Sequence, residues 1–311
     1  AFDFYEGVLV RKAYRDLEDY IVDLFNNTDG VVHWNNKTYN RIAACKPYPQ
    51  KGGGECKTDV YVLLNNIDEA TVAEIKISVK KDDAEFLANK LTAPVAEDLL
   101  GSNWKQILTE SIELIKERFT SKKNDLAFLK PNSGEIDANF TLGWKLEVTN
   151  KERTLSSPLK LTNNEIVKII FKGENQTLEK KDAVIFSNTI QENSGIAEYL
   201  INGNTDKYSN AQDVIDDLIN LDTYDAGDIY LVFTANNFRY KANKADGART
   251  LAIAVKWSVK NDRLSPEIIF DEPLIYQGER DMMPLIKQCL IQLKINDFSD
   301  IDIEKIKPNE D

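Results

Sequence analysis

The most regular alternation of hydrophobic and polar positions lies in residues 71–79, Thr-Val-Ala-Glu-Ile-Lys-Ile-Ser-Val. Apolar residues recur there with a period of two, which predicts a β-strand. One face of this strand would carry Ile75, Ile77 and Val79. The other face would carry Glu74, Lys76, Ser78 and Lys80. Charged side chains along a buried strand lose hydration, so a polar face of this kind indicates a functional use.

A second strand is predicted just upstream, over residues 59–64, Asp-Val-Tyr-Val-Leu-Leu. The polar stretch 65–69 between the two runs predicts a turn, and therefore a hairpin. Pairing in this hairpin would bring Asp59 close to Glu74 and Lys76 at one end of the sheet. The expected result is two carboxylates beside one ammonium.

The rest of the chain alternates between helical and strand patterns, which predicts an α/β protein with a mixed central β-sheet flanked by helices and enlarged by insertions. Asn35-Asn36 predicts the turn of a short hairpin over residues 31–39. Helices are expected over 5–26, from Asp82-Asp83 to Leu91, and over 103–119, 162–172, 210–221 and 280–294. Further strands are expected over 138–149, 228–234 and 249–257.

No linker rich in proline or serine interrupts the pattern, so one compact unit is favoured over separate domains. We expect a catalytic core over residues 1–125. The remaining sheet and a recognition region would follow over 126–295, packed with the core, and an acidic tail over 296–311.

The composition, 42% hydrophobic with a mean hydropathy of −0.41 over 311 residues, is typical of a soluble globular protein. No apolar run is long enough to span a membrane, and no signal peptide is visible. The three cysteines form no Cys-x-x-Cys pair. Reduced thiols and a cytoplasmic location are therefore expected.

Single residue types exclude several mechanisms. His33 is the one histidine, which excludes zinc sites built on several histidines, and no Gly-x-Ser-x-Gly accompanies it. No Gly-x-x-x-x-Gly-Lys-Ser/Thr is present, which argues against nucleoside-triphosphate hydrolysis. Carboxylates and lysines remain for catalysis.

Two neighbouring carboxylates repel each other unless a hard divalent cation such as Mg²⁺ lies between them. A nearby lysine can then position a water for attack on phosphorus. The pattern Thr58-Asp59 followed by Glu74-Ile75-Lys76 resembles the PD-(D/E)xK nuclease superfamily, with Thr58 in place of the usual proline. Within it, residues 50–92 look most like type II restriction endonucleases.

This resemblance implies a restriction-endonuclease-like core and assigns catalysis to Asp59, Glu74 and Lys76. It implies a Mg²⁺ site made by Asp59, Glu74 and the carbonyl of Ile75. Many nucleases of this superfamily add an acidic residue from the first helix, here Glu6 or Glu18. Alternatively, Glu6 favours the helix N-terminus electrostatically and Glu18 is solvated.

The net charge of −12 argues against a nucleic-acid enzyme, but the charge is segregated. Basic residues gather before Asp59 and again over residues 239–263. The stretch 236–247 reads as a basic loop with side chains suited to bases and phosphates. The expected DNA-binding residues are Lys57, Lys80, Asn236, Asn237, Arg239, Lys241 and Lys244.

Together these features predict a Mg²⁺-dependent endodeoxyribonuclease of a restriction system. It would bind double-stranded DNA as a homodimer and make double-strand breaks. The alternative is a non-catalytic nucleic-acid-binding protein on a nuclease-like scaffold. The simplest alternative is that Glu74 and Lys76 are exposed strand residues and Asp59 belongs to a turn.

Overall fold

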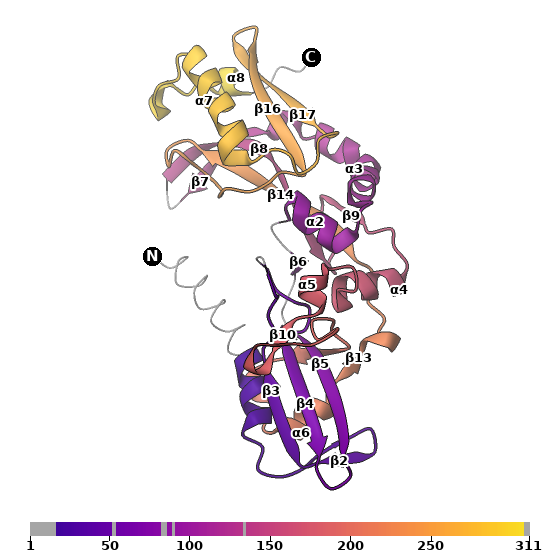
Figure 1. The fold of residues 1–311 in the computed structure, drawn as a ribbon. Helices are drawn as coiled ribbons and strands as arrows, with labels where there is room; N and C mark the ends of the chain where they lie inside the picture. The colour runs from indigo at the N-terminus through magenta and orange to yellow at the C-terminus, as the bar shows by residue number, and fades with distance from the viewer. Residues whose placement is uncertain (1–16, 52–53, 82–85, 89–90, 133–134, 308–311) are drawn as a thin grey trace. The chain divides into compact units, whose positions relative to one another are not determined.

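The computed structural model describes residues 17–51, 54–81, 86–88, 91–132 and 135–307. The chain divides into two compact units, each built from two segments (Figure 1). Unit 1 comprises residues 1–84 and 161–227, and unit 2 comprises residues 85–160 and 228–311. The expected boundary at residue 125 instead falls inside unit 2, because the first segment of unit 2, residues 85–160, is inserted between two strands of the unit 1 sheet.

Unit 1 contains a mixed five-stranded sheet, so the α/β class is confirmed. Its strand order is β13-β12-β5-β4-β3. The strands are β3 (Arg41–Cys45), β4 (Val60–Asn66), β5 (Thr71–Lys81), β12 (Tyr199–Gly203) and β13 (Ile219–Asn220). β3, β4 and β5 form an antiparallel meander, β12 runs parallel to β5, and β13 is antiparallel to β12.

One face of this sheet supplies the hydrophobic core of unit 1. The N-terminal helix, described over residues 17–26, and α6 (Ala211–Asp216) pack against it. Its buried strand residues include Val60, Val62, Leu64, Ile75, Ile77 and Val79. The alternation predicted for residues 71–79 is therefore confirmed, because each of the three predicted apolar side chains lies in this core.

Parallel pairing of β5 with β12 requires a long crossover connection, which here contains the first segment of unit 2 and a helical segment. The helical segment begins at Thr162, whose side chain forms a capping box with Glu165, as the threonine at that position predicts. Its elements are α4 (Asn163–Ile166), η2 (Val167–Lys172), α5 (Leu178–Lys181), β10 (Val184–Ile185), η3 (Phe186–Asn188) and β11 (Thr189–Ile190). The other short elements of unit 1 are β1 (Val32–Trp34), β2 (Lys37–Tyr39), η4 (Thr205–Lys207) and η5 (Leu221–Thr223).

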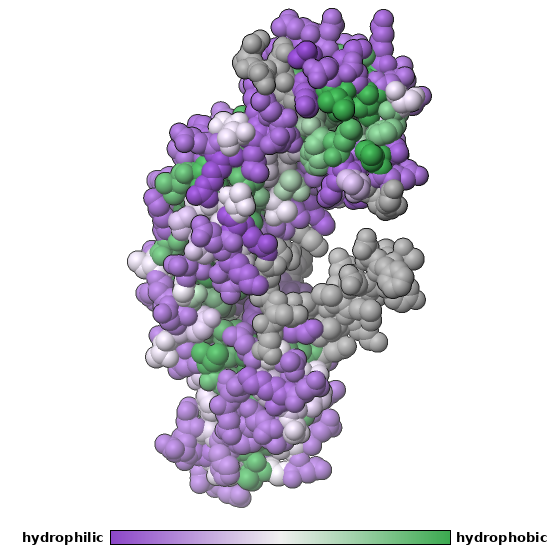
Figure 2. Space-filling view, turned by 180° about the vertical axis from the view of Figure 1, so that it is seen from behind, coloured by the Kyte–Doolittle hydropathy of each residue, from purple (hydrophilic) through white to green (hydrophobic). Residues whose placement is uncertain are grey.

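Unit 2 is built around a second sheet of order β15-β14-β8-β16-β17, with β6 and β7 also pairing with β8 and β9 pairing with β14. Its strands are β6 (Phe86–Ala88), β7 (Ala127–Asn132), β8 (Glu135–Thr149), β9 (Ser156–Pro158), β14 (Tyr230–Arg239), β15 (Lys244–Ala245), β16 (Ile253–Lys260) and β17 (Arg263–Ile269). Its helices are α2 (Ala93–Leu100), α3 (Trp104–Thr120), η1 (Lys123–Asp125), η6 (Gly278–Met282), α7 (Met283–Gln292), η7 (Phe298–Asp300) and α8 (Ile303–Ile306). Figure 2 shows a patch of apolar residues on unit 2, bordered by hydrophilic ones.

Two sequence expectations are wrong in unit 2. The helix expected up to Leu91 is replaced over Phe86–Ala88 by β6, because pairing with the long strand β8 satisfies its backbone and overrides the helical pattern. The part of the expected acidic tail that the structure describes, up to Lys307, is packed against the rest of unit 2. Ile306 is 2% exposed, and Arg263 of β17 lies 3.7 Å from Glu304.

The core of unit 1 can be tested within a single strand. Ile77 of β5 is fully buried, whereas Val72 of the same strand is 63% exposed. We expect Ile77→Ala to lower the free energy of unfolding by about 2–5 kcal/mol through lost burial and a residual cavity. Val72→Ala should change it by less than about 0.5 kcal/mol. Urea denaturation followed by circular dichroism measures both, and equal losses would contradict the assignment of the two faces.

Candidate functional site

The polar face of the β4–β5 hairpin is present as the alternation predicts. Directly opposed residues in an antiparallel pair share a face, and Tyr61 lies opposite Lys76. Lys76 and Ser78 are 7% and 2% exposed, so this face is largely covered. The reading of Lys76 as an exposed strand residue is therefore wrong.

The register of the hairpin places Asp59 opposite Ser78. The Asp59 carboxylate accepts hydrogen bonds from the Val79 N–H at 2.7 Å and from the Ser78 hydroxyl at 3.2 Å. Glu74 lies four positions before Ser78, which corresponds to about 13 Å of extended strand. Asp59 and Glu74 are therefore not brought together, and the expected metal site between them is not formed.

Glu74 and Lys76 instead make separate contacts with the crossover segment. The Glu74 carboxylate accepts a hydrogen bond from Gln191 at 3.3 Å. Burial and the neighbouring charge of Glu74 raise the pKa of Tyr61. The Lys76 ammonium lies 2.7 Å from the Glu198 carboxylate and donates to the Asn193 carbonyl at 3.4 Å. Lys76 is thus held in a largely buried ion pair, away from Asp59.

The two remaining expected metal ligands do not join a site either. The side chain of Ile75 is fully buried in the core of unit 1, opposite Val62 in β4. Glu6 lies outside the described residues. Of the two acidic candidates expected from the first helix, Glu18 is the one that the structure describes.

The backbone and the side chain of Lys57 are held by close contacts with two glycines. Its N–H and that of Thr58 both donate to the Gly195 carbonyl at 3.1 Å. Only glycine fits at position 195, since an added Cβ would lie 1.9 Å from the Lys180 carbonyl oxygen. The stem of Lys57 passes Gly173, where an added Cβ would lie 2.5 Å from the Lys57 Cγ. Gly173 also has a positive φ of 76°, which glycine adopts readily.

Three lysines form what we call the basic cluster: Lys57, Lys80 and Lys180. Burial lowers the pKa of Lys57 to about 8, and the charges of Lys80 and Lys180 act in the same direction against the opposing effect of Asp59. These four side chains therefore share one electrostatic environment. Lys57 and Lys80 were expected from the sequence, whereas nothing in the sequence pattern indicates that Lys180 joins them.

A group of carboxylates adjoins the basic cluster. Burial and the charge of Asp59 raise the pKa of Glu18, and the Glu18 carboxylate lies 2.5 Å from the Lys46 ammonium. Glu55 adds to the negative charge around Glu18. Among the described residues no three His, Cys, Asp or Glu side chains converge as metal ligands. Mg²⁺ is commonly held by one or two carboxylates and several waters, a coordination to which Asp59 can supply one carboxylate.

The other five expected DNA-binding residues belong to unit 2, and most of them make contacts within it. Asn236 is fully buried and donates to the carbonyls of Asp246 and Gly247, so the expectation that it reads bases is wrong. Asn237 also donates its amide to Asp246. Arg239 lies 2.8 Å from the same carboxylate.

The remaining two lysines lie in or beside the turn that follows β14. Lys241 lies 3.2 Å from Glu135, and its ammonium lies 4.2 Å from the ring centre of Phe298. Lys244 is exposed in β15. Half of the stretch expected as a loop is therefore strand, because β14 continues to Arg239 and pairs with β15.

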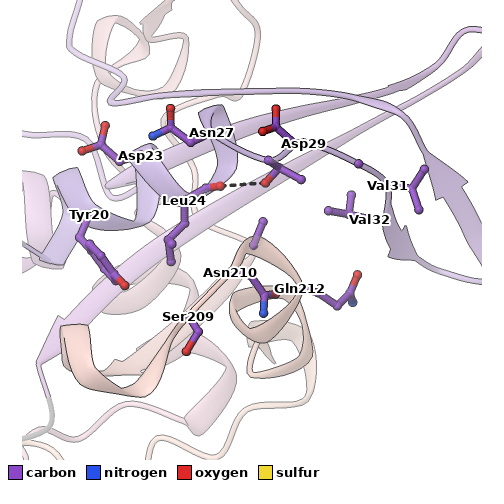
Figure 3. Close-up of a pocket in the computed structure, with 13 residues that line it drawn as sticks. Tyr20, Asp23, Leu24, Asn27, Asp29, Val31, Val32, Ser209, Asn210 and Gln212 are labelled. Atoms are coloured by element: carbon purple, nitrogen blue, oxygen red, sulfur yellow. Dashed lines mark hydrogen bonds between the residues drawn. The ribbon is translucent and has the colours of Figure 1, made fainter.

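A hollow of about 610 Å³ in unit 1 lies at the C-terminal end of the N-terminal helix (Figure 3). Asp23, Asn27 and Asp29 face it from one side, and Asn210 and Gln212 from the other. The side chain of Asn210 caps α6 by accepting from the Asp213 N–H. This hollow has acidic and amide groups but no lysine, so it differs in chemistry from the surroundings of Asp59.

The lowered pKa of Lys57 generates a prediction about stability. With a pKa of about 8 in the folded protein and an ordinary value of 10.5, the unfolded chain binds more protons between these pH values. Stability should therefore rise with pH through this window. Lys57→Met removes the desolvated ammonium, so its stability gain should be largest below pH 8 and shrink towards pH 10.5. Urea unfolding of both proteins from pH 6 to 10.5 checks this, and parallel curves would contradict it.

The structure therefore places the candidate site at Asp59 and the basic cluster, one end of the polar face, rather than at Glu74 and Lys76. Within the described part of the chain, no helix is both long and apolar enough to cross a membrane. No protein-family model matches the chain, and no curated protein or solved structure is significantly similar to it.

Proposed function

We propose that unit 1 is the catalytic core of a Mg²⁺-dependent endonuclease that hydrolyses DNA phosphodiester bonds. The observation that carries the proposal is the shared environment of Asp59 and the basic cluster. Lys57 carries a desolvated ammonium whose charge the neighbouring Lys80 makes more costly. A phosphate would neutralise it, and the carboxylate supplies the oxygen ligand that a divalent cation requires.

The architecture of unit 1 supports a restriction-endonuclease-like core. A mixed sheet is covered on its apolar face by helices, and a large insertion enters between β5 and β12. The polar face of β5 continues to Lys80, which follows Ser78 and Val79 near the end of the strand. Ser-Val-Lys at positions 78–80 therefore occupies the place that we expected Glu-Ile-Lys at 74–76 to fill.

The roles of the side chains follow from this register. Asp59 is held in one orientation by the Val79 N–H and the Ser78 hydroxyl, which leaves its second oxygen for a cation. Glu18, whose pKa is raised by burial and by the charge of Asp59, is the candidate for a second carboxylate. A bound Mg²⁺ would lower the pKa of a coordinated water and polarise the phosphate. Lys80 would orient that water, and Lys57 would hold a phosphate oxygen.

The second candidate function is nucleic-acid binding without cleavage. It is favoured by the absence of a converging three-ligand group among the described residues and by the net charge of −12. Isothermal titration with Mg²⁺ and Mn²⁺ separates the two readings. A catalytic core should bind a divalent cation in a manner that Asp59→Asn abolishes, whereas a binding protein need not bind one.

Mutations that test the register form two matched pairs. Asp59→Asn and Lys80→Gln should each lower the cleavage rate by about 10²-fold or more, because they remove groups that stabilise the transition state. Asparagine can still accept the two hydrogen bonds that orient Asp59, so folding should survive. Glu74→Gln and Lys76→Gln remove the same charges from the same sheet face and should leave the rate within a few-fold. Plasmid cleavage with Mg²⁺ measures all four.

The opposite pattern, with activity lost in the Glu74 and Lys76 variants and kept in the Asp59 and Lys80 variants, would restore the assignment made from the sequence. Full activity in all four variants would remove the nuclease proposal. Circular dichroism and DNA-binding assays on each variant distinguish a catalytic effect from unfolding.

We further propose a restriction-type enzyme that acts on double-stranded DNA as a homodimer in the cytoplasm. A double-strand break needs two catalytic centres, and a two-fold dimer provides them. The free cysteines agree with a reducing compartment: burial raises the pKa of Cys45 and of Cys56 to about 11 and keeps both thiols protonated. The apolar side of the α7 segment is part of the unit 2 core and offers no dimer contact, because Ile286, Leu290 and Leu293 are at most 5% exposed.

The dimer can be tested by its product. A homodimer should convert supercoiled plasmid to linear DNA without an accumulating nicked form. Sedimentation of a cleavage-inactive Asp59→Asn protein with duplex DNA should give two chains per duplex. Nicked plasmid as the end product, together with one chain per duplex, would leave a strand-nicking enzyme.

A further inference from the structure

A second cavity, of about 500 Å³, lies entirely within unit 2. The end of β14 and its following turn form one wall, α7 forms another, and residues 295–298 close the third side. Its aromatic lining comes from Phe238, Tyr240 and Phe298. Phe238 is 1% exposed and forms the floor, whereas Tyr240 and Phe298 are half-buried and present part of their rings.

Two lysines line the same cavity. The Lys241 ammonium lies 4.2 Å from the ring centre of Phe298, and the Lys287 ammonium lies 5.3 Å from that of Phe238. Lys241 also contacts Glu135 at 3.2 Å, in an ion pair whose carboxylate side chain is 76% exposed. An exposed pair of this kind contributes little, so its lysine can exchange the carboxylate for another anion at small cost.

The acidic groups beside the cavity are already engaged by the backbone. One Asp297 oxygen accepts from the Ser299 N–H at 2.7 Å and from the Ser299 hydroxyl. One Asp300 oxygen accepts from the N–H groups of Asn296 and Asp297 at 2.9 and 3.1 Å. These bonds close a capping box at η7 and direct both carboxylates towards their own turn. The ammoniums of Lys241 and Lys287 are then the groups best placed to meet a ligand.

We propose that this cavity binds a base of single-stranded nucleic acid, with the adjacent phosphates at Lys241 and Lys287. Aromatic rings beside positive charge are the combination that holds unpaired bases, since every base has a stacking face and every nucleotide a negative charge. Tyr240 and Phe298 are the rings with exposed surface for stacking. Asn243 and Asn296, also in the lining, can hydrogen-bond to the edge of a base.

A peptide ligand is less well matched to this lining. Its affinity would depend on covering apolar surface, yet Phe238, Leu290 and Ile295 are at most 2% exposed and have little left to cover. Ile291, 67% exposed, is the one aliphatic side chain of the lining that offers a large apolar area. Stacking and charge are therefore the larger sources of binding energy, and both favour a nucleotide.

The single-strand proposal goes beyond the proposed nuclease and does not depend on it. Duplex DNA keeps its bases stacked on one another, so this cavity selects unpaired nucleotides. Binding is measured in EDTA, where cleavage cannot occur. Failure of cleavage in the Asp59 variants and failure of base binding here are therefore separate results.

The test uses the full chain and a fluorescent single-stranded oligonucleotide, with the same sequence as a duplex for comparison. Phe298→Ala should weaken single-strand binding by about 5- to 150-fold, the effect of losing one stacked base. Lys287→Gln should reduce the slope of log affinity against log salt concentration by about 0.7. Lys256→Gln, which removes an equally positive but exposed side chain of β16 outside the cavity, should leave affinity within two-fold at moderate salt.

Photo-crosslinking with 5-iodouracil in the oligonucleotide supplies a readout independent of folding, since crosslinks should map to the peptides that contain Tyr240 or Phe298. The proposal is overturned if crosslinks map only elsewhere, or if Phe298→Ala binds as well as Lys256→Gln does. It is also overturned if an acidic peptide rich in leucine competes for the cavity while the oligonucleotide does not.

Discussion

The register of β4 against β5 is the constraint on which the rest of unit 1 depends. Burial of Ile75 and Ile77 against the N-terminal helix and α6 fixes which face of the hairpin points inward. A slip of one residue would turn Lys76 into the apolar core and expose the isoleucines, so the register is strongly specified. Once it is set, Asp59 must face Ser78, and its carboxylate receives the Val79 N–H. The location of the candidate site follows from hydrophobic burial on the opposite face of the sheet.

Burying a lysine beside the sheet costs desolvation free energy, and Lys76 and Lys57 differ in how far that cost is compensated. Lys76 is neutralised by Glu198 at 2.7 Å, which makes it a satisfied structural pair. Lys57 lies near two other lysines and one aspartate, and its lowered pKa reports the remaining cost. Two close backbone approaches maintain this arrangement, at Gly195 against the Lys180 carbonyl and at Gly173 against the Lys57 stem. Under the proposed function, a bound phosphate would offset the repulsion between Lys57 and Lys80.

The local pattern predicted the faces of β5, the Asn35-Asn36 turn and the Thr162 cap, since each depends on a few adjacent residues. The pairing across the hairpin was missed through the position of one turn. A turn over 65–69 would place Asp59 opposite Ile75, next to Glu74. The strands instead close at Asn66 and Thr71, with Ala70 in a left-handed conformation and Asn66 accepting from two turn N–H groups. That shift of one to two residues moves the partner of Asp59 by three positions, to Ser78.

The pattern of hydrophobic and polar positions could not predict contacts between distant parts of the sequence. Lys180 joins Lys57 across more than a hundred residues, most of which belong to the first segment of unit 2, and no periodicity encodes such an approach. The assignment of base-reading residues failed for a related reason. Asn236 and Arg239 have side chains that suit bases, but Asp246 returns beside β14 and engages them within the unit. Residue type indicates what a side chain can bind, whereas tertiary pairing decides whether its donors are still available.

The acidic composition argues against nucleic-acid binding, and the positions of the basic residues in the two units bear on that argument. Nucleic-acid affinity depends on the few cations that replace counterions, not on the net charge of the whole chain. Unit 1 offers the basic cluster, and unit 2 offers Lys241 and Lys287 beside aromatic rings. Because both belong to one chain, a strand held by one unit meets the other at a high effective concentration, and two weak sites can give useful affinity together. Under the proposed function, acidic groups elsewhere in the chain would oppose binding away from these sites, so a net charge of −12 would restrict where nucleic acid binds rather than prevent binding.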